Sequence, residues 1–415
     1  MVATGRVNSA GQLTLDEEQR RRWGLDPGTD FYIQETPDGL LLRRTDPPLT
    51  TVYVEPTNGC NLSCRTCVRH SWNEATGQME MSVYRRLVEG LKSIPTLRKM
   101  NFWGIGEPLL HRGLSEMVAL AKQELGVQTQ LVTNALLLTE QLSRDLVDAG
   151  LDSLVVSIDG VTPEGMEDIR DGADLRLVKE NVRRLQDIRY YSPHLNPELG
   201  IEFVAMRRNL KEMPGLRRLA NSLNASFIVV TNVLPYTREM SDEILYNLSA
   251  GSSYPSQSSV WSPEVRLPRM DLTRETVPAL AGLLAHTREG FNPRGRLDGA
   301  GGYCRFISEG SAVVGWDGEV SPCVGLMHSY RCFVMGKEKS IRRFTLGNAG
   351  TQDIADIWAN PEFARFRDLV MRFDFSPCTD CGGCDLSEKN EADCAGNGFP
   401  VCGDCLWGKG VIQCP

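Results

Sequence analysis

The sequence predicts an α/β protein built on a parallel β-sheet, with a small β module before the sheet and a cysteine-rich domain after it. Short apolar runs alternate with amphipathic helical segments between residues 50 and 235, as in a parallel sheet covered by helices. Of the 13 cysteines, three lie within residues 60–67 and ten lie from Cys304 onward. The 415 residues are enough for two or three domains.

Residues 1–46 have the pattern of the small β module. A strand pattern over residues 5–15 precedes a helical segment over residues 16–23, for which Asp16 is a suitable N-cap. A β-hairpin around Pro37-Asp38-Gly39 follows. The segment carries six Arg, no Lys and eight Asp or Glu, so its net charge is −2. A surface that binds nucleic-acid phosphates needs the opposite sign.

The central region, residues 50–235, is predicted to contain six strands and five helices. The strands are predicted at 51–54, 99–103, 130–133, 153–158, 200–205 and 227–230. The helices are predicted at 81–94, 114–124, 139–149, 178–190 and 213–223. Active sites of parallel α/β barrels form at the carboxyl ends of the strands, so the polar residues that follow these strands are the candidate site.

Cys60, Cys64 and Cys67 form a C-x3-C-x2-C motif directly after the first predicted strand. Three thiolates can hold three irons of a cubic iron–sulfur cluster and leave the fourth iron open. The alternative is half of a zinc site, but zinc usually has four ligands, and no further cysteine follows before Cys304. The motif resembles that of the radical S-adenosylmethionine (SAM) superfamily, in which the open iron chelates the amino and carboxylate groups of SAM.

This resemblance implies a partial (β/α)6 barrel with SAM contacts at its strand ends. Gly104-Ile105-Gly106-Glu107-Pro108 is similar to the family's Gly-Gly-Glu-Pro loop, whose carbonyls hold the methionine amino group, although Ile105 separates the glycines. Arg170 is expected to bind the methionine carboxylate, and the alternative is a surface arginine. Trp103 is expected in the core, and His70, His111 and His194 in structural or surface positions. The implied SAM-binding residues are Gly104, Gly106, Glu107, Thr133, Asn134, Ser157, Asp159 and Arg170.

Residues 236–300 are expected to form a connector that contains a helix near 277–286, and residues 301–415 a cysteine-rich domain. Cys304, followed by a G-x4-C sequence that ends at Cys323, resembles the SPASM extension of radical SAM enzymes, which holds two auxiliary 4Fe–4S clusters. Three clusters need 11 cysteines, so two of the 13 are spare, and Cys332 is the first candidate. A zinc ribbon at Cys378/Cys381 and Cys402/Cys405 is the alternative. The candidate auxiliary ligands are Cys304, Cys323, Cys378, Cys381, Cys384, Cys394, Cys402, Cys405 and Cys414.

Residues 1–46 also resemble a known family, the AbrB-like swapped-hairpin domains, through Gly11–Leu15, Trp23–Gly28 and Asp38–Leu42. That family usually binds DNA as an interlocked dimer. Because the net charge of the segment is −2, we expect docking or dimerisation instead. The formal net charge of −8 for the whole chain also argues against nucleic acid as the main partner. No secretory signal or membrane-spanning stretch is visible, which predicts a cytoplasmic protein without a membrane partner.

The AbrB-like start, the barrel pattern and the segment from Cys402-Gly403-Asp404-Cys405 to Cys414-Pro415 follow one another in this chain. With this order the chain as a whole most resembles the radical SAM maturases associated with tungsten-cofactor oxidoreductases. The resemblance implies reductive cleavage of SAM to a 5′-deoxyadenosyl radical, which abstracts hydrogen from a peptide or protein substrate, with an electron donor such as ferredoxin or flavodoxin. No residue is assigned a catalytic role. Two alternatives are a radical SAM enzyme that crosslinks a ribosomally synthesised peptide and an iron–sulfur redox sensor that binds DNA through residues 1–46.

Overall fold

The computed structural model describes residues 6–7, 9, 12–14, 16–17, 29–36, 39–246, 264–284, 304–379 and 384–414. The chain divides into two compact units, Met1–Pro48 and Leu49–Pro415. In the first unit, β1 (Arg6–Val7) pairs with β2 (Leu13–Thr14), and β3 (Phe31–Thr36) pairs with β4 (Gly39–Arg44), both antiparallel. The predicted hairpin is therefore present, whereas most of the helix predicted over residues 16–23 lies outside the described residues.

The second unit is built on a nine-stranded sheet with the order β11-β10-β9-β8-β7-β6-β5-β12-β13. Its central six strands are parallel neighbours in chain order, which confirms the predicted sheet. They are β5 (Thr51–Val54), β6 (Lys99–Phe102), β7 (Gln128–Thr133), β8 (Ser153–Ser157), β9 (Glu198–Ala205) and β10 (Phe227–Asn232). Every residue of β10 is buried, as expected for a parallel strand covered on both faces.

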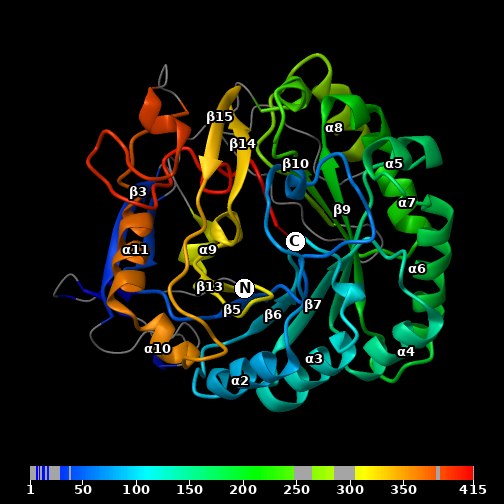
Figure 1. The fold of residues 1–415 in the computed structure, drawn as a ribbon, viewed down its shortest axis with the longest axis horizontal. Helices are drawn as coiled ribbons and strands as arrows, with labels where there is room; N and C mark the ends of the chain where they lie inside the picture. The colour runs from blue at the N-terminus through cyan, green and yellow to red at the C-terminus, as the bar shows by residue number, and fades with distance from the viewer. Residues whose placement is uncertain are drawn as a thin grey trace. The chain divides into compact units, whose positions relative to one another are not determined.

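Helices cover the outer face of these strands (Figure 1). They are α2 (Met81–Leu91), α3 (Leu114–Leu120), α4 (Glu140–Asp148), α5 (Pro163–Ile169), α6 (Leu175–Tyr190) and α7 (Leu216–Ser222), with a π-helical turn at Ala121–Leu125 after α3. Side-chain N-caps start several of them: Thr139 accepts the N–H of Leu142 in α4, and Asp174 accepts the N–H of Leu177 in α6. Among the described residues no helix is long and apolar enough to cross a membrane.

Two further parallel strands extend this sheet beyond the six predicted for the central region. β11 (Glu264–Arg266) lies in the stretch interpreted as a connector and pairs in parallel with β10; α8 (Thr276–Leu284) follows it close to the predicted helix. β12 (Ser311–Val314) pairs in parallel with β5 at the other side of the barrel strands, and β13 (Val320–Ser321) pairs antiparallel with β12. β12 comes after residue 301, the expected start of the last domain, and it pairs with the backbone groups of β5. The sheet therefore includes residues from both predicted domains.

The remaining C-terminal elements pack onto the same unit. They are α9 (Arg305–Ser308), the hairpin of β14 (Tyr330–Val334) and β15 (Lys337–Ile341), α10 (Ile354–Trp358) and α11 (Pro361–Arg372). Short 3-10 turns lie at Val68–Ser71, Pro108–Leu110, Arg207–Gly215, Glu239–Glu243, Val324–Leu326 and Asp385–Glu388. One hydrophobic cluster joins Val68 and Tyr246 to Cys332 and Leu406, so loops that follow the barrel strands share a core with the cysteine-rich part.

Candidate functional site

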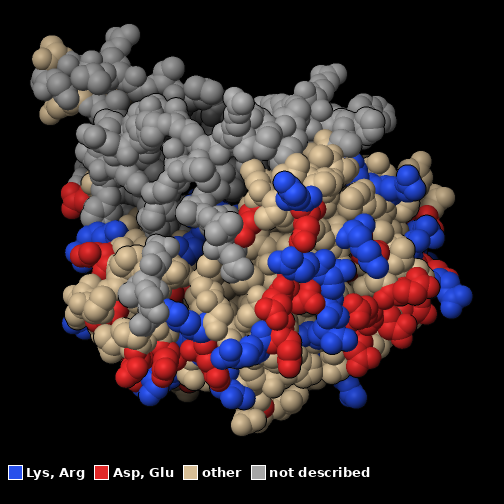
Figure 2. All heavy atoms as spheres, turned by 90° about the horizontal axis from the view of Figure 1, so that it is seen from above, with Lys and Arg blue, Asp and Glu red and all other residues tan. Residues whose placement is uncertain are grey.

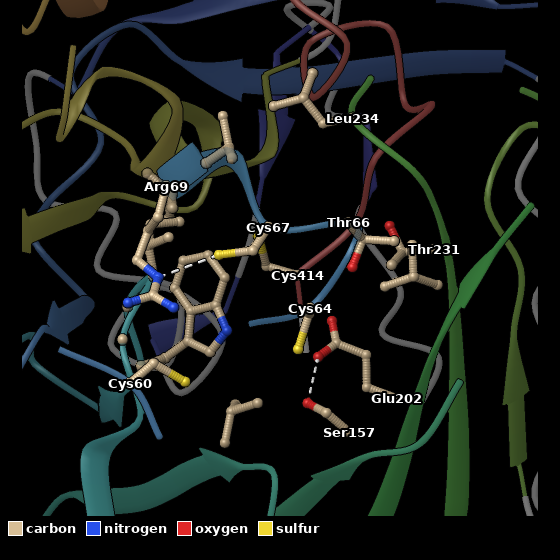
Figure 3. A pocket seen from close by; sticks show the side chains of 18 of the residues that line it. Cys60, Cys64, Thr66, Cys67, Arg69, Ser157, Glu202, Thr231, Leu234 and Cys414 are labelled. Carbon is tan, nitrogen blue, oxygen red and sulfur yellow. Dashed lines mark hydrogen bonds between the residues drawn. The ribbon is translucent and has the colours of Figure 1, made fainter. Parts of the chain in front are cut away.

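A cavity of about 230 Å³ lies at the carboxyl ends of the central strands. Cys60, Cys64 and Cys67 all belong to its wall, and the close view places them around the same space as Glu202 and Cys414 (Figure 3). The cysteines come from the loop after β5, Glu202 from β9 and Cys414 from the end of the described chain. The structure therefore brings the predicted cluster loop to the edge of the sheet where ligands bind in parallel α/β folds.

Hydrogen bonds to the end of helix α5 and to the end of strand β7 hold the cluster loop in place. The N–H of Arg65 donates to the carbonyl of Ile169 at 2.8 Å, and the N–H of Ser63 donates to that of Asp171 at 3.3 Å. The side-chain amide of Asn134, at the end of β7, donates to the Asn61 side chain at 2.8 Å. The three cysteines thus lie on a loop that is fixed from two sides.

The chemistry of this loop suits an iron–sulfur cluster. Burial raises the pKa of Cys64 to about 11, so its thiol ionises only if a cation or a metal shares the charge. Arg69 supplies one cation, with its Nε 3.2 Å from the sulfur of Cys67. Across the described ranges, no three His, Cys, Asp or Glu side chains are close enough together to coordinate a single metal ion. In a cubic cluster each thiolate binds a different iron, so the three cysteines can be farther apart than the ligands of a single ion, as they are around this cavity.

The glycines of the 104–107 loop allow it to lie directly against the cluster loop. A Cβ at Gly106 would lie 2.1 Å from the carbonyl oxygen of Thr57 and 2.6 Å from that of Gly59. The N–H of Glu107 donates to the Gly59 carbonyl at 2.7 Å. A Cβ at Gly104 would lie 2.3 Å from the Glu55 side chain. Both glycines are thus required by contacts within the protein, in addition to the close approach of a ligand that the sequence suggested.

Glu107 joins this loop to the end of β7. Its carboxylate accepts hydrogen bonds from the Thr133 hydroxyl at 2.6 Å, the Asn134 N–H at 2.8 Å and the Leu109 N–H at 3.0 Å. Burial raises the pKa of Glu107, while these hydrogen bonds oppose the shift. Glu107, Thr133 and Asn134 all line the cavity, so the structure brings these three predicted SAM-binding residues together.

Arg170 points inward and is not the surface arginine of the alternative interpretation. Its side chain is 11% exposed, and its Nε lies 2.8 Å from Oδ2 of Asp159. Burial alone would lower the pKa of Arg170, but Asp159 raises it above the ordinary value. Arg170 and Ser157 line the cavity, whereas Asp159 is fully buried and absent from the wall. Asp159 instead accepts the N–H of Val204 at 2.7 Å and holds Arg170.

Several residues of the cavity wall were not predicted from the sequence. Glu202 accepts a hydrogen bond from the Ser157 hydroxyl at 3.3 Å, and burial raises its pKa to about 7. Asn232, the last residue of β10, donates to the carbonyls of Arg269 and Val411, and its Oδ1 has no hydrogen-bond partner among the described residues. Trp103, expected in the core, also lines the wall. The signal in the sequence that could have identified Glu202 is a single acidic residue within the apolar run predicted as a strand over residues 200–205.

A second cavity collects cysteines of the C-terminal region. It is lined by Cys323, Cys332, Cys402 and Cys405. Burial, followed by the nearby thiols of Cys304 and Cys405, raises the pKa of Cys323 well above its usual value. The pKa of Cys402 is raised in the same way by burial and then by Cys405, Cys323 and Cys304. Cys304, Cys323, Cys402 and Cys405 therefore lie near one another, with Cys323 buried and the other three half-buried.

The other candidate auxiliary cysteines lie elsewhere. The hydroxyl of Ser376 is 3.0 Å from the sulfur of Cys394. Cys378 follows two residues after Ser376, and its pKa is raised by burial first and, among smaller causes, by Cys394. Cys384 is exposed at the start of the 3-10 turn Asp385–Glu388, and Cys381 lies outside the described residues.

Cys414, expected as an auxiliary ligand, lies in the wall of the first cavity (Figure 3). The neighbouring Gln413 N–H donates to the Thr231 hydroxyl at 2.9 Å, which ties this end of the chain to β10. Burial, with Glu202 as the next largest cause, raises the pKa of Cys414 to about 12.

The comparisons with known proteins agree with this geometry. Residues 54–220 match the radical SAM superfamily, and residues 304–385 match the iron–sulfur cluster-binding SPASM domain. The chain is 29% identical to a Pyrococcus furiosus protein named tungsten-containing aldehyde ferredoxin oxidoreductase cofactor-modifying protein, covering 88% of this chain and 96% of that one. It is 24% identical to a PqqA peptide cyclase from Granulibacter bethesdensis, covering 86% and 85%.

Solved structures share the fold. Streptococcus suis SuiB bound to S-adenosylmethionine aligns over 82% of this chain and 72% of its own, with a TM-score of 0.54 and 14% identity. The anSMEcpe protein with bound AdoMet aligns over 82% and 88%, with a TM-score of 0.52 and 18% identity. Residues 54–220 are therefore a radical SAM domain and residues 304–385 a SPASM domain, and these two domains imply an enzyme that uses SAM and 4Fe–4S clusters.

Proposed function

We propose that this enzyme is a maturase that modifies a peptide or protein and serves a tungsten-dependent oxidoreductase. The observation that supports it most is that Cys60, Cys64, Cys67, the 104–107 loop and Arg170 surround one cavity, in a chain that covers 96% of the Pyrococcus furiosus relative. The cluster at the three cysteines, when loaded, supplies the electron that splits SAM into methionine and a 5′-deoxyadenosyl radical, which then abstracts a hydrogen atom from the substrate.

The protein's part is to orient SAM. The carbonyls of the 104–107 loop are proposed to hold the methionine amino group, because the loop is fixed against Gly59 and faces the cavity. Arg170 is proposed to bind the methionine carboxylate, since a guanidinium suits a carboxylate and Asp159 already fixes its Nε side. Ser157, Thr133 and Asn134 then remain for the ribose and neighbouring polar groups. Asp159 becomes a support of Arg170.

The two auxiliary clusters can be assigned by the grouping of the cysteines. Cys304, Cys323, Cys402 and Cys405 are proposed to hold one cluster, because three of them line the second cavity and the Cys304 thiol lies close enough to raise the pKa of Cys323 and Cys402. The second cluster is proposed at Cys378, Cys381, Cys384 and Cys394. With the three cysteines of the first loop, these sets use 11 thiols and leave Cys332 and Cys414. Cys332 packs in the hydrophobic cluster with Tyr246 and Leu406, as expected for a cysteine that binds no metal.

Metal analysis tests this assignment on the reconstituted full chain. Cys405→Ala should lose about four of roughly 12 irons per chain, whereas Cys332→Ala, a change at the same cavity, should lose none. Equal iron loss in the two variants contradicts the assignment. Zinc in place of iron would favour the zinc-ribbon alternative.

The reaction is tested by incubating the reduced, reconstituted enzyme with SAM and measuring 5′-deoxyadenosine. Cys64→Ala should abolish the product, and continued release from this variant would refute the role of the first loop. Mass spectrometry of the tungsten oxidoreductase subunits, before and after incubation, then identifies a modified polypeptide.

A peptide-crosslinking enzyme is the second candidate, and the similarity to PqqA peptide cyclase over 86% of this chain favours it. This candidate predicts a mass change in a short precursor peptide and none in an oxidoreductase.

The iron–sulfur regulator is the third candidate and depends on the first unit. Among the described residues on the face shown in Figure 2, basic and acidic side chains are intermixed. DNA binding by the full chain in a gel-shift assay would favour the regulator.

The remaining assignments concern partners and domains. A ferredoxin or flavodoxin is proposed as electron donor. Residues 1–46 are proposed as an AbrB-like module for docking or homodimerisation, followed by a barrel at 50–235, a connector at 236–300 and the SPASM-type domain at 301–415. Light scattering of the full chain and of a variant lacking residues 1–46 distinguishes a dimer contact from a docking surface.

A further inference from the structure

A buried histidine of the C-terminal domain lies in the wall of the first cavity. His328, located between the 3-10 turn Val324–Leu326 and β14, is 2% exposed. Its Nε2 is 3.0 Å from Oε2 of Glu55, and its Nδ1 is 2.5 Å from Oε2 of Glu74. The ring of Trp72 covers it, with ring centroids 4.3 Å apart. The two carboxylates belong to the segments before and after the cluster loop.

The two contacts identify the charge of the ring. A neutral imidazole has one N–H, whereas both nitrogens of His328 face carboxylate oxygens at hydrogen-bond distance. Both nitrogens must therefore carry protons for both contacts to be favourable. Burial alone would lower the pKa of His328, but the hydrogen bonds to Glu55 and Glu74 outweigh it and raise the pKa to about 9. Arg343 is a further charge near this group, and it lies on the Glu74 side.

Glu55 contacts the 104–107 loop as well as His328. It is fully buried, its Oε1 accepts the N–H of Ile105 at 3.0 Å, and its Cγ occupies the space beside Gly104. Ile105 is the residue between the two glycines, so its amide fixes the direction of the neighbouring carbonyls. A continuous chain of contacts therefore runs from Glu74 through His328 and Glu55 to the loop.

We propose that His328 is a positioning residue for SAM: clamped as an imidazolium between Glu55 and Glu74, it fixes the Glu55 carboxylate that holds the Ile105 amide. SAM binding thereby depends on the seating of the C-terminal domain, which provides His328. The proposal rests on the proposed SAM site of the 104–107 loop. It gives a role to a charged group that the cysteine motifs and strand-end motifs leave unexplained.

The test measures SAM affinity without turnover, by anaerobic equilibrium dialysis on the cluster-loaded full chain. His328→Gln should weaken SAM binding about tenfold near neutral pH, with the iron content unchanged, because the neutral amide cannot satisfy both carboxylates. Glu55→Gln preserves the shape of the side chain and removes its charge, so it should weaken binding similarly. It also serves as the second variant if His328→Gln folds poorly.

The pH dependence separates positioning from a general packing role. The ratio of SAM affinities, wild type to His328→Gln, should be about ten below pH 8 and should fall toward one as the pH rises through about 9, because the wild-type ring then loses its proton. Taking the ratio cancels the titration of SAM itself. His111→Gln is the matched control, since this buried histidine bonds the Met79 carbonyl and has no carboxylate clamp, so its ratio to wild type should not change with pH.

Unchanged SAM affinity in both His328→Gln and Glu55→Gln overturns the proposal, as does a tenfold loss that is the same at every pH. These outcomes differ from failure of the proposed function, in which the wild-type enzyme itself neither binds SAM nor releases 5′-deoxyadenosine.

Discussion

Replacing Gly106 by Ala inserts a methyl group where backbone atoms already lie. The new Cβ would be 2.1 Å from the Thr57 carbonyl oxygen and 2.6 Å from that of Gly59. Both are backbone atoms just before Cys60, so no side chain can rotate out of the way. To restore an ordinary van der Waals contact, the two loops must move apart by roughly 1 Å.

This separation breaks the 2.7 Å hydrogen bond from the Glu107 N–H to the Gly59 carbonyl. One such hydrogen bond contributes about 1 kcal/mol net, and overpacking a filled interior costs about 1–3 kcal/mol. We therefore expect the free energy of unfolding to fall by about 2–4 kcal/mol. If about half of this loss of free energy also weakens SAM binding, the affinity for SAM falls about tenfold, because a tenfold change in affinity corresponds to about 1.4 kcal/mol.

Anaerobic scanning calorimetry and equilibrium dialysis with SAM measure the two effects. Gly398→Ala is the control, because a Cβ at Gly398 meets no atom within 4 Å. We expect this control to change stability by less than about 0.5 kcal/mol and to leave SAM affinity unchanged. Similar melting temperatures and SAM affinities for the two variants would refute the close docking of the loops.

Three further substitutions test buried charges. Glu202→Gln should raise the melting temperature, and by more at pH 8 than at pH 5. Burial raises the pKa of Glu202 from its ordinary value of 4.5 to about 7. The free energy of unfolding of the wild type therefore falls by about 3 kcal/mol as the pH rises through this range. Equal gains at both pH values would contradict this. Arg170→Met should cost about 3–5 kcal/mol in denaturant unfolding, because it leaves the Asp159 carboxylate buried without its partner, and adding Asp159→Asn should restore part of the loss. Lys339→Met should cost a similar amount, about 3–5 kcal/mol, through the buried Lys339–Asp404 pair at 2.6 Å, and a double variant with Asp404→Leu that recovers nothing would argue against the pair.

The parts of the fold that local patterns determine were predictable from the sequence. The six central strands are buried apolar runs separated by amphipathic helices, so each carries its own signal. β11 and β12 are runs of three and four residues without that alternation. Their place in the sheet is determined by the free edges of β10 and β5, which are properties of the tertiary structure.

The same distinction applies to the site. Cys60, Cys64 and Cys67 are recognisable because their spacing is local, whereas Glu55 and His328 are 273 positions apart and no local pattern connects them. Asp159 shows a third situation. Its position after β8 was predicted correctly, but its carboxylate pairs with Arg170 and does not line the cavity. The direction of a side chain after a strand is not visible in a sequence.

The pairing of β5 with β12 also determines the order of events during synthesis. About 260 residues separate the two strands, which at 5–20 residues per second corresponds to on the order of 10–50 s on the ribosome. During that interval the cluster loop that follows β5 has left the ribosome, while β12 and His328, which complete its surroundings, have not yet been made. The first cluster can therefore be inserted into a partly open barrel before the auxiliary cysteines exist, and the arrival of β12 closes the edge beside it.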